Sequence, residues 1–185
     1  MNALAKIHFF FIISLVGVVF FSCYPTEKFP REIFLEYVAC QHFSDGTRDT
    51  ALNLQVRFQK GDGNLGLEKR DTTHPYVGKY AHNLYVYAFD KDEDGTYKPI
   101  QIEIAGHPID IVFPYQIPIL TTNPKSSLKG ILDIRVRGLS FDRMQAVSKQ
   151  GVIRFEIYMY SRDVMPNGDD LEQSNIITTP DIRIK

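Results

Sequence analysis

Residues 153–160 read IRFEIYMY, and this stretch decides the fold class because aliphatic side chains alternate along it with charged or aromatic ones. Successive side chains of a β-strand point to opposite faces of a sheet, so a period of two indicates a strand with one buried face. The same alternation recurs in residues 52–58, 84–89, 100–104, 132–137 and 182–184. Gly, Pro, Asn and Asp separate these segments, which is typical of antiparallel sheets with short connections.

One segment departs from this rhythm. Ser140 followed by Phe141, Met144 and Val147 predicts a single short helix with a serine N-cap, placed between two strands. Seven to nine strands with one short helix predict an all-β fold, a two-sheet antiparallel sandwich whose inward faces interdigitate. A single closed barrel is the alternative, and the uneven loop lengths and the helix favour the sandwich.

The N-terminus predicts a secretion signal. Lys6 is followed by an almost unbroken apolar run over residues 7–21, and Ser22 then precedes Cys23. The run is shorter than the roughly 20 residues that a membrane-spanning helix needs, which favours a cleaved signal over an uncleaved anchor. We therefore expect a signal peptide over residues 1–22, a tether over residues 23–30 and a β-sandwich domain over residues 31–185.

A cysteine directly after the small residue resembles a bacterial lipoprotein signal. In that family the thiol receives a diacylglycerol, and the signal is cut in front of the cysteine. The resemblance implies lipidation of Cys23 and a membrane partner bound through the N-terminal acyl chains. It also implies an exported protein anchored in the cell envelope, at the outer membrane, and facing either the periplasm or the surface.

Acylation of Cys23 would leave Cys40 as a lone thiol. We interpret Cys40 as a small buried hydrophobic residue at the end of a strand over residues 33–39. The alternative is a reactive thiol, with His42 on the same segment as its base.

Composition limits the classes of partner. The 185 residues suit one domain, and apolar residues make up 44% of them. Without residues 1–22 the chain carries 20 basic and 22 acidic side chains, a net charge of −2. Nucleic-acid binding calls for a clustered Lys/Arg surface, so this balance argues against a nucleic-acid partner.

Three further stretches carry a second resemblance: residues 60–67 (KGDGNLGL), residues 117–121 (IPILT) with 127–130 (SLKG), and residues 153–163 with 174–176 (SNI) and 179–180 (TP). Together they resemble a group of uncharacterised Bacteroidota envelope lipoproteins with an immunoglobulin-like β-sandwich. The resemblance implies that fold and an envelope location, and it carries no activity. The family pattern resembles Asp-Gly-Asp-Gly-Asp-Ile-Gly, whereas this chain has Lys60 and Asn64 at the first and third Asp positions. A lysine among cation ligands would weaken or abolish cation binding in this loop.

The sharpest local motif is Asp90-Lys91-Asp92-Glu93-Asp94-Gly95. Aspartates at alternate positions before a glycine repeat the opening of a calcium loop, which makes Asp90, Asp92 and Asp94 candidate ligands for a weakly bound calcium ion. Position twelve is Gln101 rather than a bidentate Glu, and the flanks are strand-like, so the alternative is a charged hairpin tip. No other cofactor is expected. Residues 167–170 (NGDD) form a second acidic loop, interpreted as solvated.

No arrangement of Ser, Cys, His or carboxylates predicts catalysis. The outward residues Tyr85, Tyr87 and Phe89 form an aromatic stripe that either packs under a loop or a second sheet, or contacts a partner or glycan. We therefore expect a non-enzymatic envelope lipoprotein, a binding or assembly module for an envelope protein or glycan. The alternative is a lipid-anchored hydrolase with a dispersed site.

Overall fold

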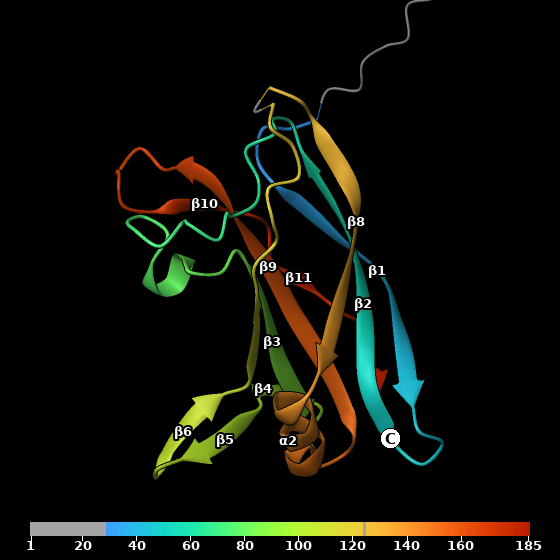
Figure 1. Cartoon of the computed structure of the whole chain (residues 1–185). Coiled ribbons are helices and arrows are strands. Elements are labelled where there is room, and N and C mark those ends of the chain that lie inside the picture. Colours follow the sequence, from blue (N-terminus) through green and yellow to red (C-terminus); the bar gives the residue numbers. More distant parts are fainter. Residues whose placement is uncertain (1–28, 124) are drawn as a thin grey trace, which may run out of the picture.

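The computed structural model describes residues 29–123 and 125–185, so the predicted signal peptide and the predicted lipidation site Cys23 lie outside the described residues. The described chain folds into antiparallel strands with one α-helix (Figure 1). Its elements are β1 (Phe34–Ser44), β2 (Asp49–Lys60), the 3-10 helix η1 (Gly78–Tyr80), β3 (Leu84–Lys91), β4 (Tyr97–Pro99), β5 (Gln101–Ile104), β6 (His107–Asp110), β7 (Val112–Tyr115), β8 (Leu128–Arg137), α2 (Leu139–Val147), β9 (Val152–Val164), β10 (Leu171–Gln173), β11 (Ile177–Thr178) and β12 (Ile182–Arg183).

Two antiparallel sheets form the sandwich. The smaller sheet has the strand order β1-β2-β8, and the larger sheet is centred on the long strands β9 and β3. The short strands β10, β11 and β12 pair in turn with β9, while β4 and β7 pair in turn with β3. The predicted all-β two-sheet sandwich with one α-helix is confirmed.

The core forms where the inward faces of the two sheets meet. Ile153, Phe155, Ile157 and Met159 on β9 are fully buried, and they alternate with residues of the outer face as the sequence predicts. Leu52, Leu54 and Val56 on β2 are equally buried and face them from the smaller sheet. The hydrophobic effect of this burial holds the two layers together.

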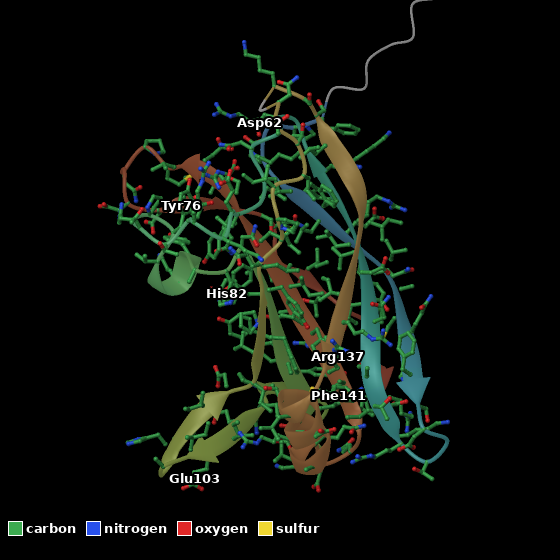
Figure 2. All side chains as sticks on the ribbon, viewed as in Figure 1. Asp62, Tyr76, His82, Glu103, Arg137 and Phe141 are labelled. Atoms are coloured by element: carbon green, nitrogen blue, oxygen red, sulfur yellow. The ribbon has the colours of Figure 1, made fainter. Side chains whose placement is uncertain are left out.

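Helix α2 connects β8 of the smaller sheet to β9 of the larger one, and it buries Phe141 and Met144 against the core (Figure 2). The predicted serine cap is wrong. The N-cap is Gly138, and Ser140 lies within the first turn. Gly138 has a φ of 81°, which glycine adopts without steric cost, so a backbone turn starts the helix.

The predicted strand over residues 100–104 does not run within the sandwich. β5 and β6 form a separate hairpin, which leaves the sheet between β4 and β7 and projects from the end of the sandwich that carries α2 (Figure 1). At its base, Ile100 and Ile111 bond to each other and to the backbone of Ala88 on β3. Strand β1 also runs beyond Cys40, where a strand end was predicted.

Phe155→Ala should lower the free energy of unfolding by about 3–5 kcal/mol, because its ring is fully buried and its removal leaves a cavity in the core. Urea denaturation measures this loss. Phe43→Ala is the matched control, since this ring is 38% exposed and stacks mainly on Arg135; its loss should stay within about 1 kcal/mol. Equal losses for the two variants would contradict the placement of the core.

Candidate functional site

The end of the sandwich where the described chain begins is organised around the ammonium group of Lys60. Lys60 is the last residue of β2, and its side chain is fully buried. Its Nζ donates to Asp163 Oδ2 at 2.7 Å, to Glu172 Oε2 at 3.1 Å and to the carbonyl oxygen of Arg31 at 2.9 Å. Asp62 Oδ1 lies 3.1 Å from the same nitrogen. One cation therefore joins β2, β9, β10 and the segment that precedes β1.

We call Lys60, Asp62, Asp163 and Glu172 the Lys60 cluster. The opposite charges of this cluster stabilise one another. Burial by itself lowers the pKa of Lys60, but hydrogen bonds to Asp163, Asp62 and Glu172 outweigh it and leave that pKa above its ordinary value. Burial likewise raises the pKa of Asp163, and the hydrogen bonds from Lys60 and Asn64 overcome it and hold the pKa below its usual range. Lysine and aspartate are therefore both ionised at neutral pH.

The loop after Lys60 needs its glycines for close backbone contacts. A Cβ atom on Gly61 would overlap the carbonyl oxygens of Phe29 and Pro30, and one on Gly63 would overlap Asn123. Gly66 has a φ of 105° and lies directly against Pro118. The loop thus packs between the start of the described chain and residues 117–123. The ammonium of Lys60, at the start of this loop, lies where the carboxylates of Asp62, Asp163 and Glu172 converge. The sequence motif did not indicate that Asp163 and Glu172 would lie there.

A groove of about 940 Å³ adjoins the Lys60 cluster. Asp163 and Glu172 reach it from the cluster, and Tyr80 and Tyr160 contribute aromatic rings. The rest is lined by polar side chains, including Arg31, Lys79, Asn167, Asp170 and Gln173, and by the apolar side chains of Val164, Met165, Pro166 and Leu171. Tyr80 donates its hydroxyl hydrogen to Asp170 Oδ1 at 2.6 Å, and Lys79 Nζ lies 2.8 Å from the same oxygen. These bonds lower the pKa of Asp170 and connect η1 to the β9–β10 turn.

Tyrosines continue from this groove along the outer face of β3 and β9. We call Tyr85, Tyr87, Tyr158 and Tyr160 the tyrosine cluster. The Tyr158 ring stacks on Tyr85 and on Tyr87, with centroids 5.6 and 5.8 Å apart, and meets Tyr160 edge-on at 5.5 Å.

Within the tyrosine cluster, Tyr160 is buried beside Tyr80, whereas Tyr85, Tyr87 and Tyr158 are half-buried. Of the predicted stripe Tyr85, Tyr87 and Phe89, all three residues are half-buried, and Tyr85 contacts the η1 segment by donating its hydroxyl hydrogen to the carbonyl oxygen of Lys79. Burial raises the pKa of Tyr85, Tyr158 and Tyr160, so their hydroxyls stay protonated and can donate hydrogen bonds.

The predicted calcium ligands lie in a hairpin. Asp90 belongs to β3, and Asp92 and Asp94 lie in the turn that leads to β4. Asp90 accepts from the Ser148 hydroxyl and from the backbone N–H of Lys149, which follow α2.

The other two aspartates of this hairpin also have protein partners. Asp92 Oδ2 lies 2.6 Å from Lys98 Nζ, and this bond, with help from Glu93 N–H and Lys149, lowers the pKa of Asp92 to about 2. Asp94 accepts from the hydroxyl and the N–H of Thr96. Over residues 29–123 and 125–185, no three His, Cys, Asp or Glu side chains are grouped so that they could hold a metal ion. The calcium site stays a prediction.

The two acidic loops lie at opposite ends of the sandwich. Asp90 pairs with Ile153 near the start of β9, whereas the loop of residues 167–170 follows Val164 at the far end of the same strand. A joint site is therefore excluded.

Cys40 is half-buried, and burial together with the nearby Asp49 raises the pKa of its thiol to about 11. His42 Nδ1 lies 3.1 Å from Asp49 Oδ2, so this ring has a carboxylate partner. The raised pKa of Cys40 disfavours a reactive thiol.

Comparison with protein families, with curated proteins and with solved structures finds no match for this chain. Within the described part of the chain, the one α-helix is too short to cross a membrane, and no other helix could do so.

Lys60→Met should lower the free energy of unfolding by about 3–5 kcal/mol, because the carboxylates around it lose their buried cation. Chemical denaturation at pH 7 measures this loss. Lys98→Met is the matched control. It removes an ion pair whose lysine is 66% exposed, so its effect should stay within about 1 kcal/mol. Equal effects of the two substitutions would contradict a central role for Lys60.

The loss caused by Lys60→Met should also depend on pH. The pKa of Asp163 is below its ordinary value of 3.8 in the folded protein, so its contribution is fully present above pH 3.8. As the pH falls from 3.8 through the folded-state pKa, that contribution disappears. Denaturation curves from pH 7 down to pH 2 should therefore show the stability difference between wild type and variant narrowing below pH 3.8. A constant difference would contradict the ion pair.

If the predicted calcium site exists, the melting temperature should rise with millimolar calcium and return to its calcium-free value after a chelator is added. Because Lys98 and Lys149 already contact Asp92, calcium would have to displace them. Calorimetry of the wild type and of Asp94→Asn tests the site. A calcium-dependent rise in the wild type alone would support it, and equal curves with calcium and chelator would contradict it.

Proposed function

We propose that this chain is an envelope lipoprotein, acylated at Cys23, whose β-sandwich acts as a non-catalytic binding module. The tether over residues 23–30 would hold the domain at the outer membrane. The sequence around Cys23 supports the anchor, and the surface of the sandwich supports the binding role.

The observation that carries the binding role is the tyrosine cluster on the outer face of β3 and β9. Aromatic side chains placed outside the core are characteristic of binding surfaces, because their rings offer contact area and their hydroxyls offer hydrogen bonds. Tyr160 lines the groove next to Lys60 and contacts Tyr158 of the open face. The groove and the tyrosine cluster therefore adjoin at the largely buried ring of Tyr160.

This surface would lie near the membrane. Arg31 lines the groove and follows Cys23 by eight residues. A fully extended chain spans at most about 3.3–3.6 Å per residue, so the edge of the groove would stay within about 30 Å of the acylated cysteine. A ligand in the envelope close to the lipid surface suits this placement.

The carboxylates of the groove argue against the alternative, a lipid-anchored hydrolase. An acid catalyst at neutral pH needs a carboxyl group whose pKa is raised toward the working pH. The pKa of Asp163 is instead lowered, because Lys60 stabilises its ionised form. The pKa of Asp170 is also lowered, by its hydrogen bonds with Lys79 and Tyr80. These acids suit a structural and ligand-contacting role.

Cys23→Ser should abolish acylation, since a serine hydroxyl does not replace the thiol in this modification. Expressed as the full chain in a bacterium that processes lipoproteins, the wild type should incorporate labelled fatty acid, lose residues 1–22 and partition into detergent. The serine variant should do none of these. Cys40→Ser removes the other cysteine and should behave as wild type. If Cys23→Ser still fractionates with membranes and keeps residues 1–22, the lipoprotein assignment is overturned.

A further inference from the structure

The outer face of the larger sheet concentrates the tyrosines of this protein. Seven of its ten tyrosines lie there or against it: Tyr76, Tyr80, Tyr85, Tyr87, Tyr97, Tyr158 and Tyr160. Three half-buried rings of this set, Tyr85, Tyr158 and Tyr87, are nearly parallel, with 21° between neighbouring planes. Among the exposed large hydrophobic side chains of the described residues, none is on β3, and β9 has only Val164 at its end.

Charged side chains of both signs flank these rings. Along β9 the outward positions are Arg154, Glu156, Tyr158, Tyr160 and Arg162, so charged residues flank the aromatic ones. Arg162 stacks on Tyr76 with its guanidinium carbon 4.8 Å from the ring centroid, and Arg154 stacks on Tyr97 at 3.8 Å. The face is therefore aromatic and polar together, with two arginines and one glutamate of β9 around the rings, and Arg162 is paired with Asp71.

We propose that the tyrosine cluster and the adjoining groove bind a neutral oligosaccharide built of pyranose units. This inference deepens the proposed function, because it rests on the binding role of the same surface and names the ligand class.

Two features of the surface match that chemistry. A pyranose ring presents C–H groups on its faces, which pack on aromatic rings, and hydroxyls at its edge, which need donors and acceptors in the same plane. The half-buried rings of Tyr85, Tyr158 and Tyr87 supply aromatic surface for the first, with Tyr158 stacked between the other two. Glu156 beside them and Asn167, Asp170 and Gln173 in the groove supply the second.

A protein partner fits this surface less well. The centre of a protein–protein contact is depleted in charged residues and excludes water. Here Glu156 and Arg154 lie among the rings, and both would have to be desolvated under a dry partner. A charged polymer also fits poorly, since the groove pairs Lys79 with Asp170 and carries Arg31 near Asp163.

Tyrosine fluorescence is a direct readout, because the chain has no tryptophan and half of its ten tyrosines lie at the proposed site. The full chain in detergent would be titrated with two probes, a β-1,4-linked tetramer of N-acetylglucosamine and an α-1,4-linked tetramer of glucose. Isothermal calorimetry would give the affinity. We expect saturable binding of at least one tetramer, with an unchanged affinity at high salt because the ligand is neutral.

Tyr87→Ala and Tyr158→Ala should each weaken that binding at least tenfold. Tyr87 is half-buried and has one hydroxyl contact, to Tyr158 at 3.4 Å, so its removal should leave the fold intact and keeps the test valid if Tyr158→Ala unfolds. Phe43→Ala removes an accessible ring from the opposite sheet and should leave the affinity unchanged.

Three results would overturn the proposal: no binding of either tetramer at millimolar concentration, binding that Tyr87→Ala does not weaken, or a self-association that Tyr87→Ala abolishes. The last would assign the face to a second copy of the chain. The oligosaccharide test is independent of the test of the lipid anchor. The Cys23→Ser variant should no longer associate with membranes but should still bind the oligosaccharide, whereas a titration without binding would say nothing about acylation.

Discussion

The ammonium group of Lys60 is the constraint on which the surface of this sandwich depends. The hydrophobic core joins the two sheets, but the short strand β10 has only three residues and could not hold its position by backbone pairing alone. The bond from Lys60 to Glu172 fixes β10 from the smaller sheet, and the bond to Asp163 fixes the end of β9. Because the same ammonium also contacts Arg31, the start of the domain is fixed with them.

The groove and the tyrosine cluster follow from this arrangement. The β9–β10 turn carries Asp170 to the hydroxyl of Tyr80, and η1 is thereby held over Tyr160. The remaining tyrosines stay open because this cover reaches only one end of the outer face. The attachment of β10 to β9 thus accounts for two features. It places the buried charges close to the groove, and it leaves the rings beyond the groove accessible.

Alternation along the chain predicts most of the sandwich, because burial on one face is a local property of each strand. The core positions on β9 and β2 and the hairpin that contains Asp92 follow from this pattern. The Lys60 cluster does not, since Asp163 and Glu172 are 103 and 112 residues away along the chain. Its one local signal was a lysine at the start of a glycine-rich loop that contains Asp62. The cap of α2 was missed because Gly138 starts the helix by its backbone conformation, without a side chain.

A positive charge supplied by a side chain is covalently attached, and this has a consequence for the envelope location proposed above. Dissolved ions vary in concentration outside the cytoplasm, and a competing chelator can remove them, whereas Lys60 stays part of the chain. The end of the domain that would lie nearest the lipid surface is therefore closed by a component made with the chain itself. The structure of this end of the domain forms when the chain folds, and the Lys60 cluster that closes it does not depend on the concentration of dissolved metal ions.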